Sequence, residues 1–369
     1  MCLTFDSITD QKRPVRILAA FLQKRSIPHA LLFTGIEGVG KKDAALVFAM
    51  ACNCTAEKPG RSDQFIDNSG SKKDLPTTVN PCGCCRSCRK IESGNHPDII
   101  RIKPSGTFIK IDQIRGFCDT LAMKPYEARV RVVIISDAHS MNPSASNALL
   151  KMLEEPPDSS ILILTALQTS DLLPTIVSRC QHIRFNPVSV KSIETRLIEN
   201  QGLTPEKAAI IAAMANGSIS RAFAMSRSNW INRRNWLINA VGPNQSDQSD
   251  QTGALLSISS GMLMAFAAML KKNKDFLFDS LEIMKSWLRD LVIYNFHTEK
   301  IINKDLIEKI QYASQKIDIK SLLFKIDAIQ AAQKNIQSNA NLRLTLETMM
   351  MRIERGPETI KPNEKSSRN

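Results

Sequence analysis

The chain has 369 residues, of which 43% are hydrophobic and 23% are charged. A chain of this length can bury a large core and commonly divides into two or three domains, and its composition excludes a wholly disordered protein. The formal charge of +13 favours an anionic partner such as nucleic acid. Because the basic residues are scattered along the chain, a solvated basic surface is an equal alternative.

Charged residues near the N-terminus, and the lack of an apolar region there, argue against a secretory signal. The most apolar stretch, residues 255–270, contains serines and is shorter than the roughly 20 residues that span a bilayer, so we expect a buried helix there. The protein is therefore expected in the cytoplasm. Its nine cysteines then favour a metal site or reduced thiols over a disulfide framework.

Short apolar runs alternate with helical patterns over residues 1–186. This alternation predicts an α/β fold with a parallel sheet covered by helices on both faces. The expected strands are residues 30–34, 98–103, 130–136, 160–166 and 182–185, and the expected helices are residues 41–50, 111–121, 144–153 and 171–177. Residues 55–81 are rich in polar residues and glycine, which indicates an exposed insertion.

A different pattern begins at Pro187, where short helices predict a small helical lid over residues 187–241. A polar linker follows at residues 242–253. Amphipathic patterns continue to Arg355 and predict an all-helical domain over residues 254–355. The tail, residues 356–369, has almost nothing to bury and is expected to be disordered.

Residues 35–41 match the pattern G-x-x-x-x-G-K and lie between an expected strand and an expected helix. In that context Gly35, Gly38, Gly40 and Lys41 are candidates for a loop that wraps phosphate with backbone amides and a lysine. The next residue is Lys42, where a serine or threonine would hold magnesium. A glycine turn that merely joins strand to helix is therefore an equal alternative, and ATP binding is doubtful.

The strand over residues 130–136 is followed by one carboxylate. A hydrolytic site of this type needs an acidic pair there, one group for magnesium and one for water. Counting back from the helix that follows places Ser136 at the magnesium position and Asp137 at the water-orienting position. Because both motifs lack a magnesium ligand, we expect no intrinsic ATPase activity.

Two overlapping C-x-x-C steps link Cys82, Cys85 and Cys88, and Cys54 completes a possible set of four thiolates. Such spacing is typical of a structural zinc site, in which four filled positions leave no place for a catalytic water. Because 27 residues separate the first ligand from the others, Cys52 or Cys84 can substitute in the set. A cluster of free reduced cysteines is the remaining alternative.

Five segments, taken together and in this order, resemble the bacterial clamp-loader subunits: PHALLFTGIEGVGKK, CGCCRSC, GNHPDIIRIKPSGTFIKIDQIR, VVIISDAHSMNPSASNALLKMLEEPP and TIVSRCQHIRF. The resemblance extends over about residues 5–225. It implies an AAA+ core, a zinc-binding insertion within about residues 52–92, a helical lid, and a C-terminal collar that joins a five-subunit ring. Such a ring loads the sliding clamp of DNA polymerase III onto primed DNA.

The broken phosphate loop and acidic pair resemble the delta-prime type of subunit more than the ATP-hydrolysing gamma/tau type. The resemblance implies gamma/tau and delta subunits, the clamp and primer-template DNA as partners, and a rigid stator role. Arg179 in the tripeptide Ser-Arg-Cys would then be an arginine finger for ATP on an adjacent gamma/tau subunit. Taken without the resemblance, Arg179 is equally an ordinary surface cation. The departures from the family pattern are Lys42, Ser136, the single carboxylate Asp137 and the insertion.

Two other functions compete with this interpretation. The first is an active gamma/tau-type motor, against which the missing magnesium ligands argue. The second is a zinc-dependent nucleic-acid-binding module, which the basic flank formed by Arg86, Arg89 and Lys90 permits. No aromatic residues interleave with these cations to stack on bases, so the flank alone does not require nucleic-acid binding.

Overall fold

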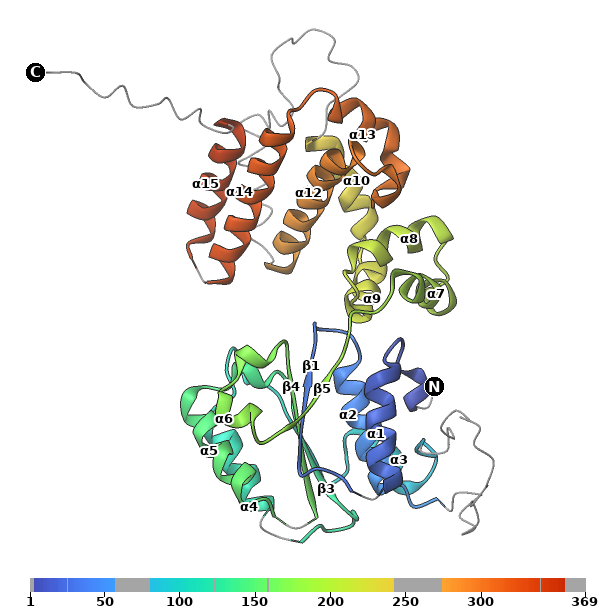
Figure 1. Cartoon of the computed structure of the whole chain (residues 1–369), viewed down its shortest axis with the longest axis vertical. Coiled ribbons are helices and arrows are strands. Elements are labelled where there is room, and N and C mark those ends of the chain that lie inside the picture. The colour runs from blue at the N-terminus through green and yellow to red at the C-terminus, as the bar shows by residue number, and fades with distance from the viewer. Residues whose placement is uncertain are drawn as a thin grey trace, which may run out of the picture. The chain divides into compact units, whose positions relative to one another are not determined.

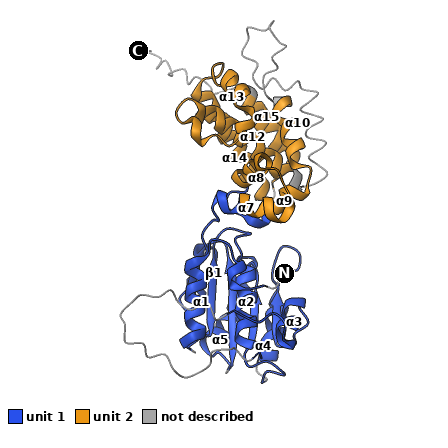
Figure 2. Cartoon of the chain, turned by 90° about the vertical axis from the view of Figure 1, so that its right-hand side faces the viewer, with its two compact units in different colours: residues 1–193, 215–221 blue, residues 194–214, 222–369 orange. Residues whose placement is uncertain are grey.

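The computed structural model describes residues 3–24, 26–56, 80–121, 124–157, 159–241, 274–338 and 340–355. The helix expected at 255–270, the linker, the tail and most of the insertion lie outside these ranges. The chain forms two compact units, drawn in different colours in Figure 2: residues 1–193 with 215–221, and residues 194–214 with 222–369. The more finely divided domain boundaries expected from the sequence stay predictions.

Five parallel strands form the sheet of the first unit, in the order β2-β3-β4-β1-β5. They are β1 (Ala30–Thr34), β2 (Ile99–Ile102), β3 (Arg131–Ile135), β4 (Ser160–Ala166) and β5 (Gln181–Arg184). All residues of β1 and β3 are buried, as continuous apolar strands are when helices cover both faces of a parallel sheet. The predicted α/β fold with a parallel sheet is confirmed.

Helices cover both faces of this sheet (Figure 1). On one side lie α1 (Lys12–Lys24), α2 (Lys41–Asn53) and α3 (Arg86–Ser93), and on the other lie α4 (Ile111–Leu121), α5 (Pro143–Glu154) and α6 (Pro174–Val177). Helix α5 starts at Pro143 because the Asn142 side chain accepts a hydrogen bond from the Ala145 N–H at 2.8 Å. Helix α6 is shorter than expected, since Thr169–Asp171 forms a separate 3-10 turn and Pro174 starts the helix.

The segment before β3, residues 124–130, forms an arch, which we call the 124–130 arch. The Asp98 carboxylate is buried and accepts hydrogen bonds at 2.8–2.9 Å from the N–H groups of Tyr126, Glu127 and Ala128. It also pairs with the Arg131 guanidinium at 2.9 Å. Burial raises the pKa of Asp98, but these hydrogen bonds outweigh it and lower the pKa to about 2.

The depressed pKa means that the ionised Asp98 stabilises the arch throughout the neutral pH range. This contribution is lost only as the pH falls from about 4 toward 2, because the unfolded chain binds the proton first. A second buried side chain holds the end of the arch, where Asn53 Oδ1 accepts the N–H groups of Arg129 and Val130 at 3.0 Å. The backbone of the arch is therefore fixed at both positions.

The described part of the second unit is helical. Its helices are α8 (Pro205–Met214), α10 (Trp230–Val241), α12 (Lys274–Tyr294), α13 (Ile307–Ser314), α14 (Ile319–Gln337) and α15 (Leu342–Arg355). Helices α7 (Val190–Gln201) and α9 (Ile219–Arg227) begin in the first unit and end in the second. Short 3-10 turns occupy Thr298–Lys300 and Lys304–Leu306 in this unit, and Phe5–Ser7 and Ala138–Ser140 in the first unit. None of the helices in the described ranges is long and apolar enough to cross a membrane.

A buried polar network ties three parts of this second unit together. Arg234 on α10 is 1% exposed and bonds Asn303 at 3.1 Å and Asp305. Asn303 in turn donates its side-chain amide to the buried Asp290 of α12 at 2.8 Å. Because every charged member has a partner, the network fixes the loop between α12 and α13 against α10.

Candidate functional site

The phosphate-loop candidate, residues 35–41, joins β1 to the start of α2. Gly35 has a φ of +144° and Gly38 a φ of +77°, values that side chains rarely adopt. A Cβ atom on Gly35 would lie 2.4 Å from the Phe185 carbonyl oxygen, and one on Gly38 would lie 2.2 Å from Ser218 Oγ. Packing within the first unit therefore requires these two glycines whether or not a nucleotide binds.

Lys41 closes the loop on itself. Its side chain is buried, and its ammonium donates hydrogen bonds to the carbonyl oxygens of Gly35 and, at 2.9 Å, Ile36. Burial lowers the pKa of Lys41, and the negative charges of Asp137 and Glu37 offset this shift only in part. To reach an outer phosphate, the ammonium would have to leave both carbonyl oxygens.

Two of the residues that depart from the family pattern, Lys42 and Asp137, contact each other. The Lys42 ammonium lies 2.8 Å from Asp137 Oδ2, although 95 residues separate the two along the chain. Asp137 follows β3 in a left-handed conformation and its N–H donates to Thr165 Oγ1 at 3.0 Å. Where a hydrolytic site would place a hydroxyl and a carboxylate around magnesium, this chain places an ion pair. The sequence showed both departures but not their pairing.

We expect the variant Gly38→Ala to lower the free energy of unfolding by about 2 kcal/mol or more, since alanine is strained at a positive φ and would collide with Ser218. Chemical denaturation of the full chain without nucleotide measures this loss. Gly116→Ala is the matched control, because Gly116 lies inside α4 with open space around it. That variant should be stabilised by up to about 1 kcal/mol. Equal stability of both variants would contradict the packing role of Gly38.

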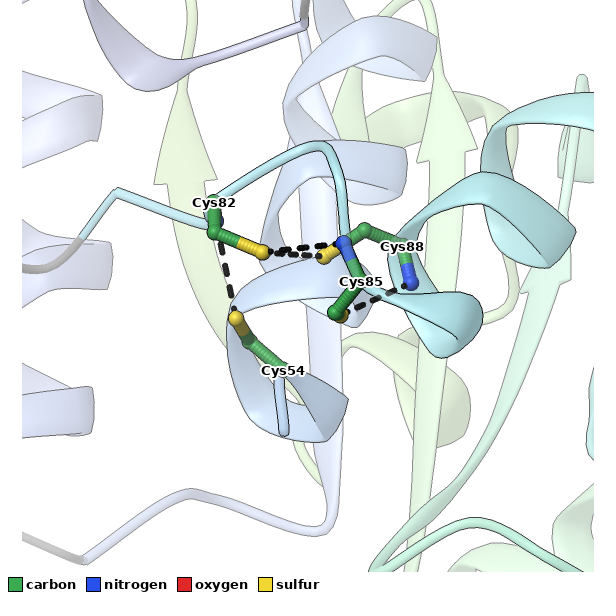
Figure 3. Close-up of side chains that lie close together, drawn as sticks. All are labelled: Cys54, Cys82, Cys85 and Cys88. Carbon is green, nitrogen blue, oxygen red and sulfur yellow. Dashed lines mark hydrogen bonds between the residues drawn. The ribbon is translucent and has the colours of Figure 1, made fainter. Parts of the chain in front are cut away.

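Four cysteines converge between the end of α2 and the start of α3 (Figure 3). The Sγ atoms of Cys54, Cys82, Cys85 and Cys88 all lie within 4.8 Å of one another. Four thiolates at 2.3 Å from a zinc ion would be about 3.8 Å apart, so the group is close to the spacing that zinc requires. Cys84 is exposed, and neither it nor Cys52 belongs to this group.

Backbone N–H groups point at these sulfur atoms, as they do around thiolates. The Cys85 N–H donates to Cys82 Sγ at 3.2 Å, and the Cys88 N–H donates to Cys85 Sγ at 3.4 Å. Burial raises the pKa of Cys85, but the N–H of Cys88 and hydrogen bonds from Thr55 outweigh it and lower the pKa to about 5. Burial raises the pKa of Cys88. The group can therefore hold a metal ion that accepts thiolate ligands, such as zinc.

Arg179 follows α6, which lies on the other face of the sheet from α2 and α3 (Figure 1). Its Nη2 atom pairs with Glu154 Oε1 at the end of α5 at 2.8 Å, and its Nη1 atom donates to the Thr175 carbonyl oxygen at 3.1 Å. The side chain is 37% exposed. The guanidinium is thus held at the surface of the first unit with part of its hydrogen-bonding capacity free for another charge. The sequence did not indicate Glu154 as its partner.

Comparisons with known proteins agree on one family. A family model described as DNA polymerase III, delta subunit, matches residues 10–189, and one described as DNA polymerase III, delta subunit, C terminal, matches residues 248–355. The DNA polymerase III subunit delta' of Bacillus subtilis is 31% identical over 348 residues, which cover 94% of this chain and 97% of that protein.

The tau subunits of the same polymerase also match, but over a smaller share of each chain. The tau subunit of Bacillus subtilis is 30% identical over 226 residues, which cover 60% of this chain but 37% of the relative. The tau subunit of Escherichia coli is 30% identical over 228 residues, 32% of its length. The chain thus spans about a third of the tau relatives and almost the whole of the delta-prime relative. As the resemblance of its motifs implied, the chain belongs to the delta-prime subunits of DNA polymerase III.

Proposed function

We propose that this chain is the stator of a clamp loader, takes part in the ATP-driven loading of the sliding clamp onto primed DNA, and hydrolyses no ATP itself. The observation that carries the proposal is the ion pair of Lys42 and Asp137, 2.8 Å apart at the position of a magnesium site. An ammonium at this place repels a divalent cation, and it occupies the carboxylate that would orient the attacking water. Without magnesium, phosphoryl transfer loses its main source of charge stabilisation.

This subunit would then contribute to ATP hydrolysis at the nucleotide site of a neighbouring subunit. Arg179 is exposed enough to reach the ATP of an adjacent gamma/tau subunit, where a planar guanidinium stabilises charge on the transferring phosphoryl group. Gamma/tau and delta subunits are the partners in the proposed five-subunit ring, which acts on the clamp and primer-template DNA. The helices of residues 254–355 would form the collar, and a zinc ion held by the four cysteines would brace the first unit.

Steady-state ATP hydrolysis tests this function, first with the isolated chain and then with a loader reconstituted from gamma/tau, delta, clamp and primed DNA. We expect no hydrolysis by the isolated chain and DNA-stimulated hydrolysis by the assembly. The variant Lys41→Ala, checked for native unfolding behaviour, should leave the assembly's rate unchanged. Turnover by the isolated chain that Lys41→Ala abolishes would instead identify a gamma/tau-type motor.

A further inference from the structure

Tyr126 is the most exposed of the large hydrophobic side chains in the described ranges, at 86%. It lies on the 124–130 arch, and its own backbone N–H is bonded to the buried Asp98 carboxylate at 2.8 Å. A tyrosine that is presented to solvent by a fixed backbone contributes little to the core. Its ring is available for a partner that offers a flat surface.

The arch and the cysteine group are joined within the first unit through Asn53. Asn53, which holds the end of the arch, directly precedes Cys54. On the other side, the Lys90 ammonium of α3 bonds both carboxylate oxygens of Glu127 at 2.7 Å. Tyr126 is therefore placed beside α3, although 36 residues separate it from Lys90 in the sequence.

Helix α3 contacts the arch through Lys90, which lies on its basic side. Arg89 and Lys90 follow Arg86 by three and four residues, so the three cations share one side of the helix, while Cys88 and Ile91 on the opposite side are buried. The hydrogen bond from Lys90 lowers the pKa of Glu127, and the charge of Arg86 lowers it further. The positive charge of Lys90 thus balances the negative charge of Glu127, so Glu127 does not offset the charge of the other cations.

Two more exposed cations, Lys124 and Arg129, lie on the arch itself, before and after Tyr126 in the sequence. We propose that Tyr126, together with Arg86, Arg89, Lys124 and Arg129, forms a contact site for single-stranded nucleic acid. We call these five residues the Tyr126 platform. In such a site the aromatic ring stacks on an unpaired base while the cations bind the phosphates on either side.

The combination of groups favours a single strand over other anionic partners. A duplex keeps its base faces stacked inside, where a surface tyrosine cannot reach them, and an acidic peptide would need the cations but not the ring. The basic flank of the cysteine motif lacks an aromatic residue in the sequence, and folding supplies one from a distant loop. The platform shares no residue with the phosphate loop or with Arg179, so its test is independent of the test of the proposed stator role.

Fluorescence anisotropy of the full chain with a labelled oligothymidylate of about 16 nucleotides tests the ring. We expect Tyr126→Ala to weaken binding by about 5-fold or more, the usual loss for one stacked base, and Tyr126→Phe to bind as the wild type. Phe296→Ala is the matched control, because Phe296 is 64% exposed in the other unit. The proposal is wrong if the wild-type chain does not bind, or if Tyr126→Ala binds as tightly as the wild type.

A salt titration tests the cations in the same assay. The double variant Arg86→Ala, Arg89→Ala should reduce the slope of log affinity against log salt by about 0.7 for each phosphate that is no longer neutralised. Lys207→Ala, which removes an exposed cation of α8, should leave the slope unchanged. An oligoglutamate peptide should compete poorly with the oligonucleotide. If it competes equally well, the platform recognises charge alone and the proposal is overturned.

Discussion

Replacing Arg179 by alanine should slow ATP hydrolysis at the adjacent gamma/tau site of a reconstituted clamp loader by about 10³-fold or more, the usual effect of losing an arginine finger. Single-turnover hydrolysis with the loader saturated in ATP measures this effect directly. The wild-type assembly should consume its bound nucleotide in one phase. The Arg179→Ala assembly should leave a slow fraction that corresponds to the one affected site.

The geometry of Arg179 explains why a lysine should not replace it. The guanidinium already uses one edge for Glu154, at 2.8 Å, and can offer other N–H groups to a phosphate. A lysine ammonium has no planar fork with which to contact two anions in this way, so Arg179→Lys should remain slow. The control is Arg184→Ala, which removes an exposed arginine of β5. A loader with Arg179→Ala that hydrolyses all its ATP at the normal rate would make Arg179 an ordinary surface cation.

Replacing Cys88 by serine should remove bound zinc from the chain and lower its thermal stability. Cys88 is fully buried in the first turn of α3, and its loss leaves three thiolates for an ion that requires four ligands. Structural zinc ions in small domains contribute about 10–16 kcal/mol of apparent binding free energy, part of which would be lost here. Metal content per chain and the unfolding temperature, each with and without a chelator, measure the two effects.

The matched control lies in the same motif. Cys84 is exposed and outside the group of four, so Cys84→Ser should keep both the zinc and the stability of the wild type. Equal zinc loss in both variants would point to a different ligand set. A wild-type chain that binds no zinc, and whose unfolding temperature a chelator does not change, would identify the cysteines as free thiols.

Local patterns in the sequence were enough to predict the buried strands of the first unit and the family of the protein. Continuous apolar runs predicted the buried parallel strands, because a strand that is covered on both faces has no solvent-exposed side where polar residues would alternate with apolar ones. The glycine spacing around Lys41 and the absence of a hydroxyl at Lys42 indicated a phosphate loop without its magnesium ligand. The motifs, read together, were specific enough to indicate the family that the comparisons confirm.

Tertiary structure alone decided which distant residues meet. It placed Cys54, and neither Cys52 nor Cys84, with the other three thiols, and it joined Lys42 to Asp137 across 95 residues. It also brought the arch that carries Tyr126 against α3, because the Tyr126 N–H bonds Asp98 and Lys90 of α3 bonds Glu127. Helical and strand periodicities report which side of an element is buried, but the pairing of side chains depends on how the elements pack in three dimensions.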